Sequence, residues 1–188
     1  MLLSRFNIVT LQRKDHARME QLLRSYESHS ADRFRLYAQI VQLVTTHAFA
    51  EETVLFPAAR RLLPQSDSLT QDIEAKHQQV NELMIEMHAL EPGEPGFEER
   101  AARLFGLLRA DAREEEDVLL TALVAATDER HLQSIGATWA AARLTAPNRP
   151  HPRVSRRPPG NMLAGLPLAL IDRARRLFER RREHEARS

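Results

Sequence analysis

One short segment of the sequence contains two residues of types that commonly bind metal ions. His47 and Glu51 are four residues apart, so in a helix both side chains point the same way. Both fall in an apolar stripe at helical spacing that runs from Leu36 to Leu55, where a packed core would favour leucine. A buried imidazole and a buried carboxylate each need a polar partner, and one metal ion would serve both. The segment therefore predicts a metal site inside a helical protein.

The second half of the sequence repeats this arrangement with one substitution. When the two copies are aligned on their paired glutamates, Asp111 and Glu115 take the places of the first histidine and glutamate. A further histidine precedes each copy: His16 lies 31 residues before the first copy, and His77 lies 34 residues before the second. These separations fit one helix, a loop and part of an antiparallel helix. The sequence thus predicts two similar helix pairs, each giving an inward histidine and an inward pair of ligands.

The elements that must position these residues are helices, because helical periodicity dominates the sequence and strand alternation is missing. Four long amphipathic helices with short loops predict an all-α fold, an up-down-up-down four-helix bundle. Ser68 and Gln71 form a capping box for the third helix, and Pro64 ends the second. We expect bundle helices over residues 10–28, 32–63, 68–90 and 97–126, and a fifth helix over 128–144. Together they make one domain, residues 1–145.

A basic tail is expected after this domain. Residues 146–160 are rich in Pro and Arg and indicate a linker, and residues 161–188 predict a basic amphipathic helix. From Arg149 onward the sequence has 11 Arg against 4 acidic residues, whereas the preceding part has 16 basic and 22 acidic residues. We expect the tail helix to pack on the bundle or on a second copy of the chain, as in a homodimer, with an anionic membrane surface as the alternative. No DNA-binding motif is present, so nucleic acid is not an expected partner.

Composition narrows the class of protein further. A chain of 188 residues is long enough to bury one sizeable core, and its net charge of +1 points to no partner by itself. The sequence has no cysteine, which excludes disulfides and thiolate metal sites. The first residues lack the apolar run of a signal peptide, and no apolar stretch has the length of a membrane span. These features predict a cytoplasmic protein.

The combined pattern resembles the hemerythrin-like family, also called the HHE cation-binding domain. The resemblance covers about residues 10–126. It is supported by the pair Asp15-His16, the run Glu51-Glu52-Thr53-Val54-Leu55-Phe56-Pro57, and the run Glu114-Glu115-Glu116. The tail sequence Pro158-Pro159-Gly160-Asn161, followed by Ala164-Gly165, is similar to the C-terminal extension of actinobacterial members.

The resemblance implies a four-helix bundle around an oxo- or hydroxo-bridged di-iron centre. In that arrangement His16, His47 and His77 are terminal nitrogen ligands, and Glu51 and Glu115 are bridging carboxylates. Asp111 completes the predicted metal-ligand set, in a position where the family has histidine. Imidazole and carboxylate donors together suit iron or manganese better than magnesium, and zinc is a further alternative.

Two further departures from the family pattern bear on the expected function. Asn81 stands where oxygen-carrying hemerythrins have another histidine, and Leu120-Thr121 replaces the usual Phe-Pro. With Asp111, they leave three histidines and a larger share of carboxylates, and anionic ligands favour Fe(III). We therefore expect a centre that reacts with or senses O2, peroxide or nitric oxide, rather than one that transports O2.

Two other functions remain as alternatives from the sequence. One is a degenerate bundle that acts as an interaction or oligomerisation module, with weak or no metal binding. The other is iron storage or ferroxidase chemistry, for which no shell-forming surface is evident. No catalytic residue is predicted. The glutamates next to the motifs, Glu52, Glu114 and Glu116, are interpreted as a solvated face, with an indirect role at the site as the alternative.

Overall fold

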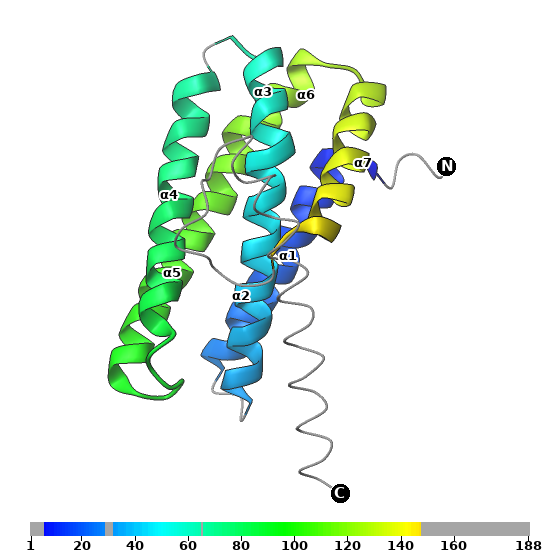
Figure 1. The fold of residues 1–188 in the computed structure, drawn as a ribbon. Coiled ribbons are helices and arrows are strands. Elements are labelled where there is room, and N and C mark those ends of the chain that lie inside the picture. Colours follow the sequence, from blue (N-terminus) through cyan, green and yellow to red (C-terminus); the bar gives the residue numbers. More distant parts are fainter. Residues whose placement is uncertain (1–5, 29–31, 65, 148–188) are drawn as a thin grey trace, which may run out of the picture.

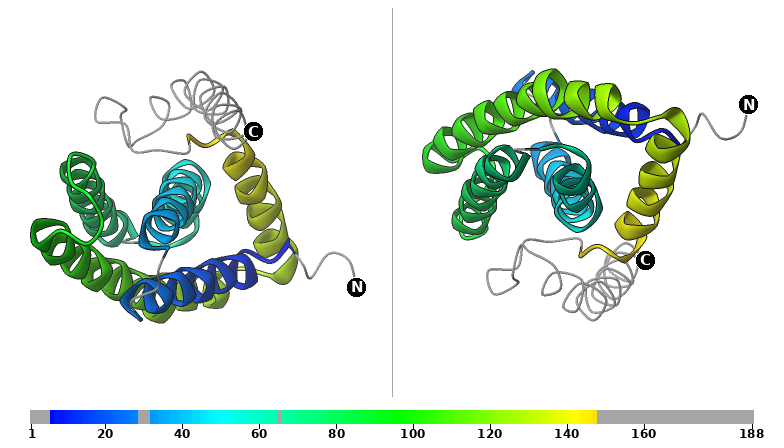
Figure 2. Two further views of the ribbon diagram at one scale, coloured as in Figure 1. Left: turned by 90° about the horizontal axis from the view of Figure 1, so that it is seen from below. Right: turned by 90° about the horizontal axis from the view of Figure 1, so that it is seen from above.

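The computed structural model describes residues 6–28, 32–64 and 66–147, and every regular element among them is helical. Four long helical rods run alternately up and down, and a further helix lies at the side of the bundle opposite α4 (Figures 1 and 2). The elements are α1 (Ile8–Glu27), α2 (Arg33–Ala50), η2 (Glu51–Leu55), α3 (Phe56–Leu62), α4 (Ser66–Met87), α5 (Pro95–Glu114), η3 (Glu115–Leu120), α6 (Thr121–Ala126) and α7 (Glu129–Thr145). This confirms the predicted all-α bundle with a fifth helix. The predicted tail helix lies outside the described residues.

Each of the two longest rods contains one π-helical turn. The segments α2, η2 and α3 follow one another without a break in helical backbone angles, and so do α5, η3 and α6. The π turns begin at Glu51 and Glu115, the two glutamates that align in the two halves of the sequence. A π turn widens the helix by one residue and is frequent at functional sites. The sequence pattern predicts uninterrupted α-helices here, and the structure differs at these two turns.

The helix ends follow local chemistry. Asn7 accepts a hydrogen bond from the backbone N–H of Val9 and starts α1, two residues earlier than expected. The capping box predicted at Ser68 and Gln71 is wrong, because α4 already begins at Ser66 and both residues lie inside it.

Within the described residues, no helix combines the length and the apolar character that crossing a bilayer requires.

The core consists of two apolar clusters with a polar layer between them. Along each of the four rods, a histidine or carboxylate lies between residues of one cluster and residues of the other, and the cluster that comes first alternates from rod to rod. The Tyr26 cluster contains Met19, Leu22, Leu23, Tyr26, Ile40, Val44, Val80, Leu83, Met84, Met87, Phe97, Ala101, Leu104, Phe105 and Leu108. The Phe56 cluster contains Ile8, Ala50, Leu55, Phe56, Ala59, Ile73, Leu119, Leu120, Leu123, Leu132 and Trp139. The site residues are therefore enclosed by packing on both sides.

Helix α7 packs on α1, α2 and η2. Gly136 permits the closest approach, since a Cβ atom at this position would lie 1.7 Å from the backbone oxygen of Phe6. Leu132 and Trp139 on the same helix are buried in the Phe56 cluster. The fifth helix is thus part of the core and lies close to the polar layer.

Candidate metal centre

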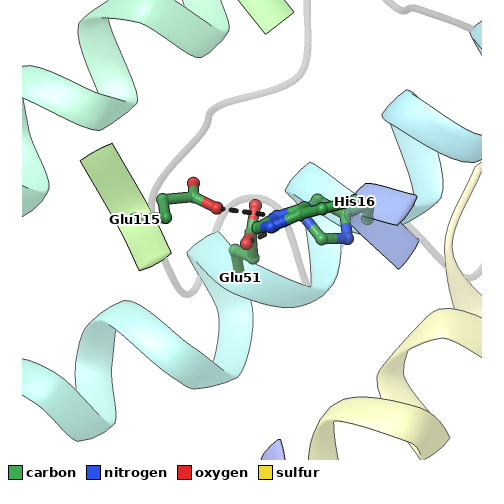
Figure 3. A group of neighbouring side chains, drawn as sticks. His16, Glu51 and Glu115 are labelled. Carbon is green, nitrogen blue, oxygen red and sulfur yellow. Dashed lines mark hydrogen bonds and ion pairs between the residues drawn. The ribbon is translucent and has the colours of Figure 1, made fainter. Parts of the chain in front are cut away.

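The structure brings together all six residues that the sequence analysis assigned to the metal site. They come from four elements or their junctions: α1, the end of α2 with η2, α4, and the end of α5 with η3. Figure 3 shows Glu115 and His16 pointing toward one another with Glu51 beside them. All of them are buried except His47, whose side chain is 13% exposed. We call this set the inner residues: His16, His47, Glu51, His77, Asp111 and Glu115.

The inner residues form two overlapping groups of donor atoms. His16, His47, Glu51 and Glu115 each offer one atom, and these atoms all lie within 4.8 Å of one another. His77, Asp111 and Glu115 form the second group by the same measure. One glutamate therefore belongs to both groups, as expected of a carboxylate placed between two ions.

Each of the two glutamates of the π turns directs its two oxygens at different histidines. For Glu51, Oε1 lies 2.9 Å from Nε2 of His47, while Oε2 lies 3.6 Å from Nε2 of His77. For Glu115, Oε2 lies 3.1 Å from Nε2 of His16, while Oε1 lies 3.7 Å from Nε2 of His77. Each carboxylate thus has one oxygen directed at a histidine of the first half and the other at the histidine of the second half.

Asp111 reaches the site although its side chain is shorter than that of histidine. Its Oδ2 lies 3.2 Å from Nε2 of His77, and the residue is 6% exposed. Its other oxygen, Oδ1, is buried and accepts no hydrogen bond from any residue that the structure describes. The aspartate is placed as a potential ligand in the second group.

Three further carboxylates surround the inner residues, and we call them the outer carboxylates: Asp15, Glu52 and Glu116. Each accepts a hydrogen bond from Nδ1 of one histidine: 3.2 Å from His47 to Asp15, 2.9 Å from His77 to Glu52, and 2.8 Å from His16 to Glu116. When Nδ1 carries the proton, the neutral ring turns the lone pair of Nε2 toward the centre. All three rings therefore present Nε2 to the centre, as metal ligands would.

The interpretation of the flanking glutamates as a solvated face is wrong for Glu52. Its side chain is 2% exposed, and it contacts a histidine that is 25 residues away in the sequence. Glu116 is half-buried and contacts His16, whereas Glu114 is half-buried and pairs with Lys76. Neighbouring helical residues point about 100° apart, so periodicity alone assigned only one glutamate of each pair to the inner face. The doubling of the glutamate in both halves was the signal that could have indicated the second.

The electrostatics of the cluster favour a cation. Burial alone would lower the pKa of His47, but the charge of Glu51 and the hydrogen bonds to Asp15 and Glu51 raise it to about 10. Burial and the charge of Glu115 raise the pKa of Glu51. Burial alone would also raise the pKa of Glu115, but hydrogen bonds from His16 and His77 lower it. The carboxylates thus attract positive charge, which protons supply in the metal-free cluster and which metal ions could supply in their place.

Buried carboxylate oxygens are a second reason why this set of donors fits a metal ion. Both oxygens of Glu51 and Oε1 of Glu115 are buried, and in the described part of the chain a donor reaches them only when a histidine of the cluster carries a proton on Nε2. A buried carboxylate oxygen without a donor is costly, and coordination to an ion would satisfy it. Imidazole nitrogens with carboxylate oxygens are a donor set for iron, manganese or zinc.

A small cavity opens onto the centre from the side of the Tyr26 cluster. Its volume is about 40 Å³, and five of the inner residues border it, all but Glu51. The other walls are mainly apolar, with Met19, Val44, Met84 and Leu108 among them, and Asp15, Thr45 and Asn81 add polar groups. One water occupies roughly 10–15 Å³ by the same kind of measure, so the space suits a few waters or one small molecule.

Comparison with known proteins identifies the class that this fold and site define. The model of the hemerythrin HHE cation binding domain family matches residues 7–123, and the chain belongs to this family. A protein of Nostoc sp. named DNA nickase is 29% identical over 119 residues, which cover 62% of this chain and 33% of that protein. An uncharacterized hemerythrin-like protein of Schizosaccharomyces pombe is 23% identical over 172 residues, covering 89% of this chain and 84% of that protein. The chain spans about a third of the length of the Nostoc relative. No solved structure matched significantly.

Proposed function

We propose that this protein binds two metal ions, with iron as the preferred metal. We further propose that the metal-loaded centre reacts with or senses O2, peroxide or nitric oxide. One observation carries the proposal: each of Glu51 and Glu115 has one oxygen directed at a histidine of the first half and the other directed at His77. In this assignment His16 and His47 would hold one ion, and His77 and Asp111 would hold the other. Glu51 and Glu115 would be shared between the two ions.

Bound iron would supply one-electron chemistry toward small oxygen species, and the protein residues would control it. The outer carboxylates keep the proton of each histidine on Nδ1 and so keep Nε2 free for the metal. The apolar walls of the cavity limit the entry of water and leave space for a small molecule beside the centre. Three carboxylates against three histidines favour the ferric state, which supports reaction or sensing over reversible O2 transport.

The first test is the metal content of untagged protein made in iron-supplemented medium, measured by plasma mass spectrometry. We expect about two ions per chain in the native protein and one or none after the double substitution His47→Ala, Glu51→Ala. The matched control is Glu82→Ala, His88→Ala, which removes the same residue types from exposed positions on and just after α4. Equal iron content in the two double variants would refute the assignment.

A second measurement addresses reactivity. An iron-loaded centre is expected to show near-ultraviolet absorption that changes on addition of peroxide, azide or nitric oxide. A native protein without stoichiometric metal would instead support the interaction-module alternative. DNA nicking is not proposed for this chain, because the match to the Nostoc protein covers only a third of that protein.

A further inference from the structure

The fifth helix contacts the metal centre through one outer carboxylate. Oδ2 of Asp15 accepts the hydrogen bond from Nδ1 of His47 at 3.2 Å, and the same oxygen lies 2.6 Å from Nη1 of Arg143 on α7. The Asp15 side chain is 13% exposed and that of Arg143 is 27% exposed, so the contact is partly shielded from water, and charges interact more strongly there than in bulk solvent. The chain of contacts therefore runs from α7 through Asp15 to an inner histidine.

Trp139 provides a second contact between α7 and the same histidine. Its indole ring meets the imidazole of His47 edge to face, with ring centroids 5.7 Å apart. The guanidinium of Arg143, one turn further along α7, lies 4.9 Å from the centre of the indole ring. Since Trp139 is 1% exposed, its ring is fixed by packing. Helix α7 thus contacts both the ring of His47 and the carboxylate that orients that ring.

The other two outer carboxylates are placed differently. Glu116 lies in η3, and an arginine of α1, Arg13, approaches it at 3.7 Å from an exposed position. Glu52 lies in the η2 turn and is buried beside His77. The contact with Arg143 is therefore specific to the partner of His47.

We infer that Arg143 is a positioning residue, which fixes Asp15 and through it the orientation of His47, so that docking of α7 and metal binding favour each other. The inference rests on the proposed function, because the coupling requires a metal-binding site. Without Arg143, Asp15 has one fewer contact to keep it against Nδ1, and His47 samples orientations that do not present Nε2 to the metal. By linkage, whatever factor α7 docking adds to metal affinity, metal binding adds to α7 docking.

The test uses the full chain with Co²⁺ as the probe and absorbance titration as the measurement. Changing a direct partner of a ligand histidine typically weakens metal binding by about 10- to 100-fold. Arg143 acts one contact further away, so we expect Arg143→Gln to weaken one of two Co²⁺ equivalents by roughly three- to tenfold. Arg143→Lys should recover most of this loss, because it keeps the charge. Arg130→Gln, at an exposed position on the same helix, is the matched control and should bind as the native protein does.

A second readout separates positioning from a general loss of structure. In the Co²⁺-loaded protein, the Nδ1–H protons of the three inner histidines are expected to give exchangeable, metal-shifted proton NMR signals. We expect Arg143→Gln to speed solvent exchange of one of these three signals and to leave the other two unchanged. In the native protein, Co²⁺ loading should slow hydrogen exchange of amides near the end of α7, over residues 139–145.

The outcomes distinguish this inference from the proposed function. If native protein binds no Co²⁺, the metal site itself is refuted and the inference with it. If native protein binds Co²⁺ and Arg143→Gln matches Arg130→Gln in affinity and NMR signals, only the role of Arg143 is refuted. Unchanged hydrogen exchange in α7 on loading the native protein would refute the coupling even if Arg143→Gln failed to fold.

Discussion

The two outer glutamates make similar hydrogen bonds to a ligand histidine but differ in burial, and Glu116 has in addition an exposed arginine, Arg13, at 3.7 Å. Glu52 accepts from Nδ1 of His77 at 2.9 Å, and Glu116 accepts from Nδ1 of His16 at 2.8 Å. The side chain of Glu52 is 2% exposed, whereas that of Glu116 is 31% exposed. Water screens the second charge and not the first, so the same substitution should have unequal consequences.

Glutamine is the appropriate replacement because it keeps the shape and the acceptor oxygen and removes only the charge. For Glu52→Gln we expect about tenfold weaker metal binding, the lower end of the range for direct partners of ligand histidines. This corresponds to about 1.4 kcal/mol. For Glu116→Gln we expect about two- to threefold, because exposed charged pairs contribute only about 0.2–1 kcal/mol.

The assay is a Co²⁺ titration with a competing chelator, carried out on both variants and on Glu114→Gln. Glu114 is 32% exposed and pairs with Lys76 instead of a histidine, so its substitution should leave affinity unchanged. The loss in Glu52→Gln should fall on one of the two Co²⁺ equivalents, the one assigned to His77 and Asp111. If Glu52→Gln and Glu116→Gln lost equal metal affinity, or if Glu116→Gln lost more, burial would not determine how much an outer carboxylate contributes to metal affinity.

Three further predictions address stability and binding. Removing metal with a chelator should lower the melting temperature of the native protein, and an unchanged melting curve would contradict stoichiometric binding. The pKa of His47 in the metal-free protein is raised from 6.5 to about 10, so protonated His47 stabilises the fold fully below pH 6.5, and this stabilisation is lost as the pH rises toward 10. Metal-free protein should therefore melt at a lower temperature at pH 9 than at pH 7, measured by scanning fluorimetry. In metal-loaded protein, where Nε2 would bind the ion, the difference between the two melting temperatures should be smaller. Gly136→Ala places a methyl group 1.7 Å from the oxygen of Phe6 and should destabilise the protein by about 1–3 kcal/mol in urea unfolding, with Gly106→Ala, which meets no neighbour within 4 Å, as the harmless control.

The inner residues could be predicted from the sequence because each occupies a core position of an amphipathic helix. A histidine or carboxylate in an apolar stripe is conspicuous, and four-residue spacing places two of them on one face. The same rule explains the confirmed bundle and the expectation of a fifth helix, whose apolar residues Leu132 and Trp139 are buried.

What the sequence did not show depends on contacts between distant residues or on small changes in helical geometry. Arg143 and Asp15 are 128 residues apart, and no local pattern links them. The π turns insert one residue into a helix, a shift too small for periodicity to reveal over so short a segment. Glu52 resembled a surface residue because its partner, His77, comes from the other half of the chain.

The outer glutamates connect the two halves crosswise. Glu52 of the first half orients His77 of the second, and Glu116 of the second half orients His16 of the first. Neither helix pair is therefore self-sufficient: each lacks the group that fixes its own upstream histidine. If the chain were divided in the loop after α3, we expect that neither fragment alone would form the centre. Metal binding would then indicate that the two fragments had associated. The internal symmetry of this bundle thus makes its two halves depend on each other for the orientation of their histidines.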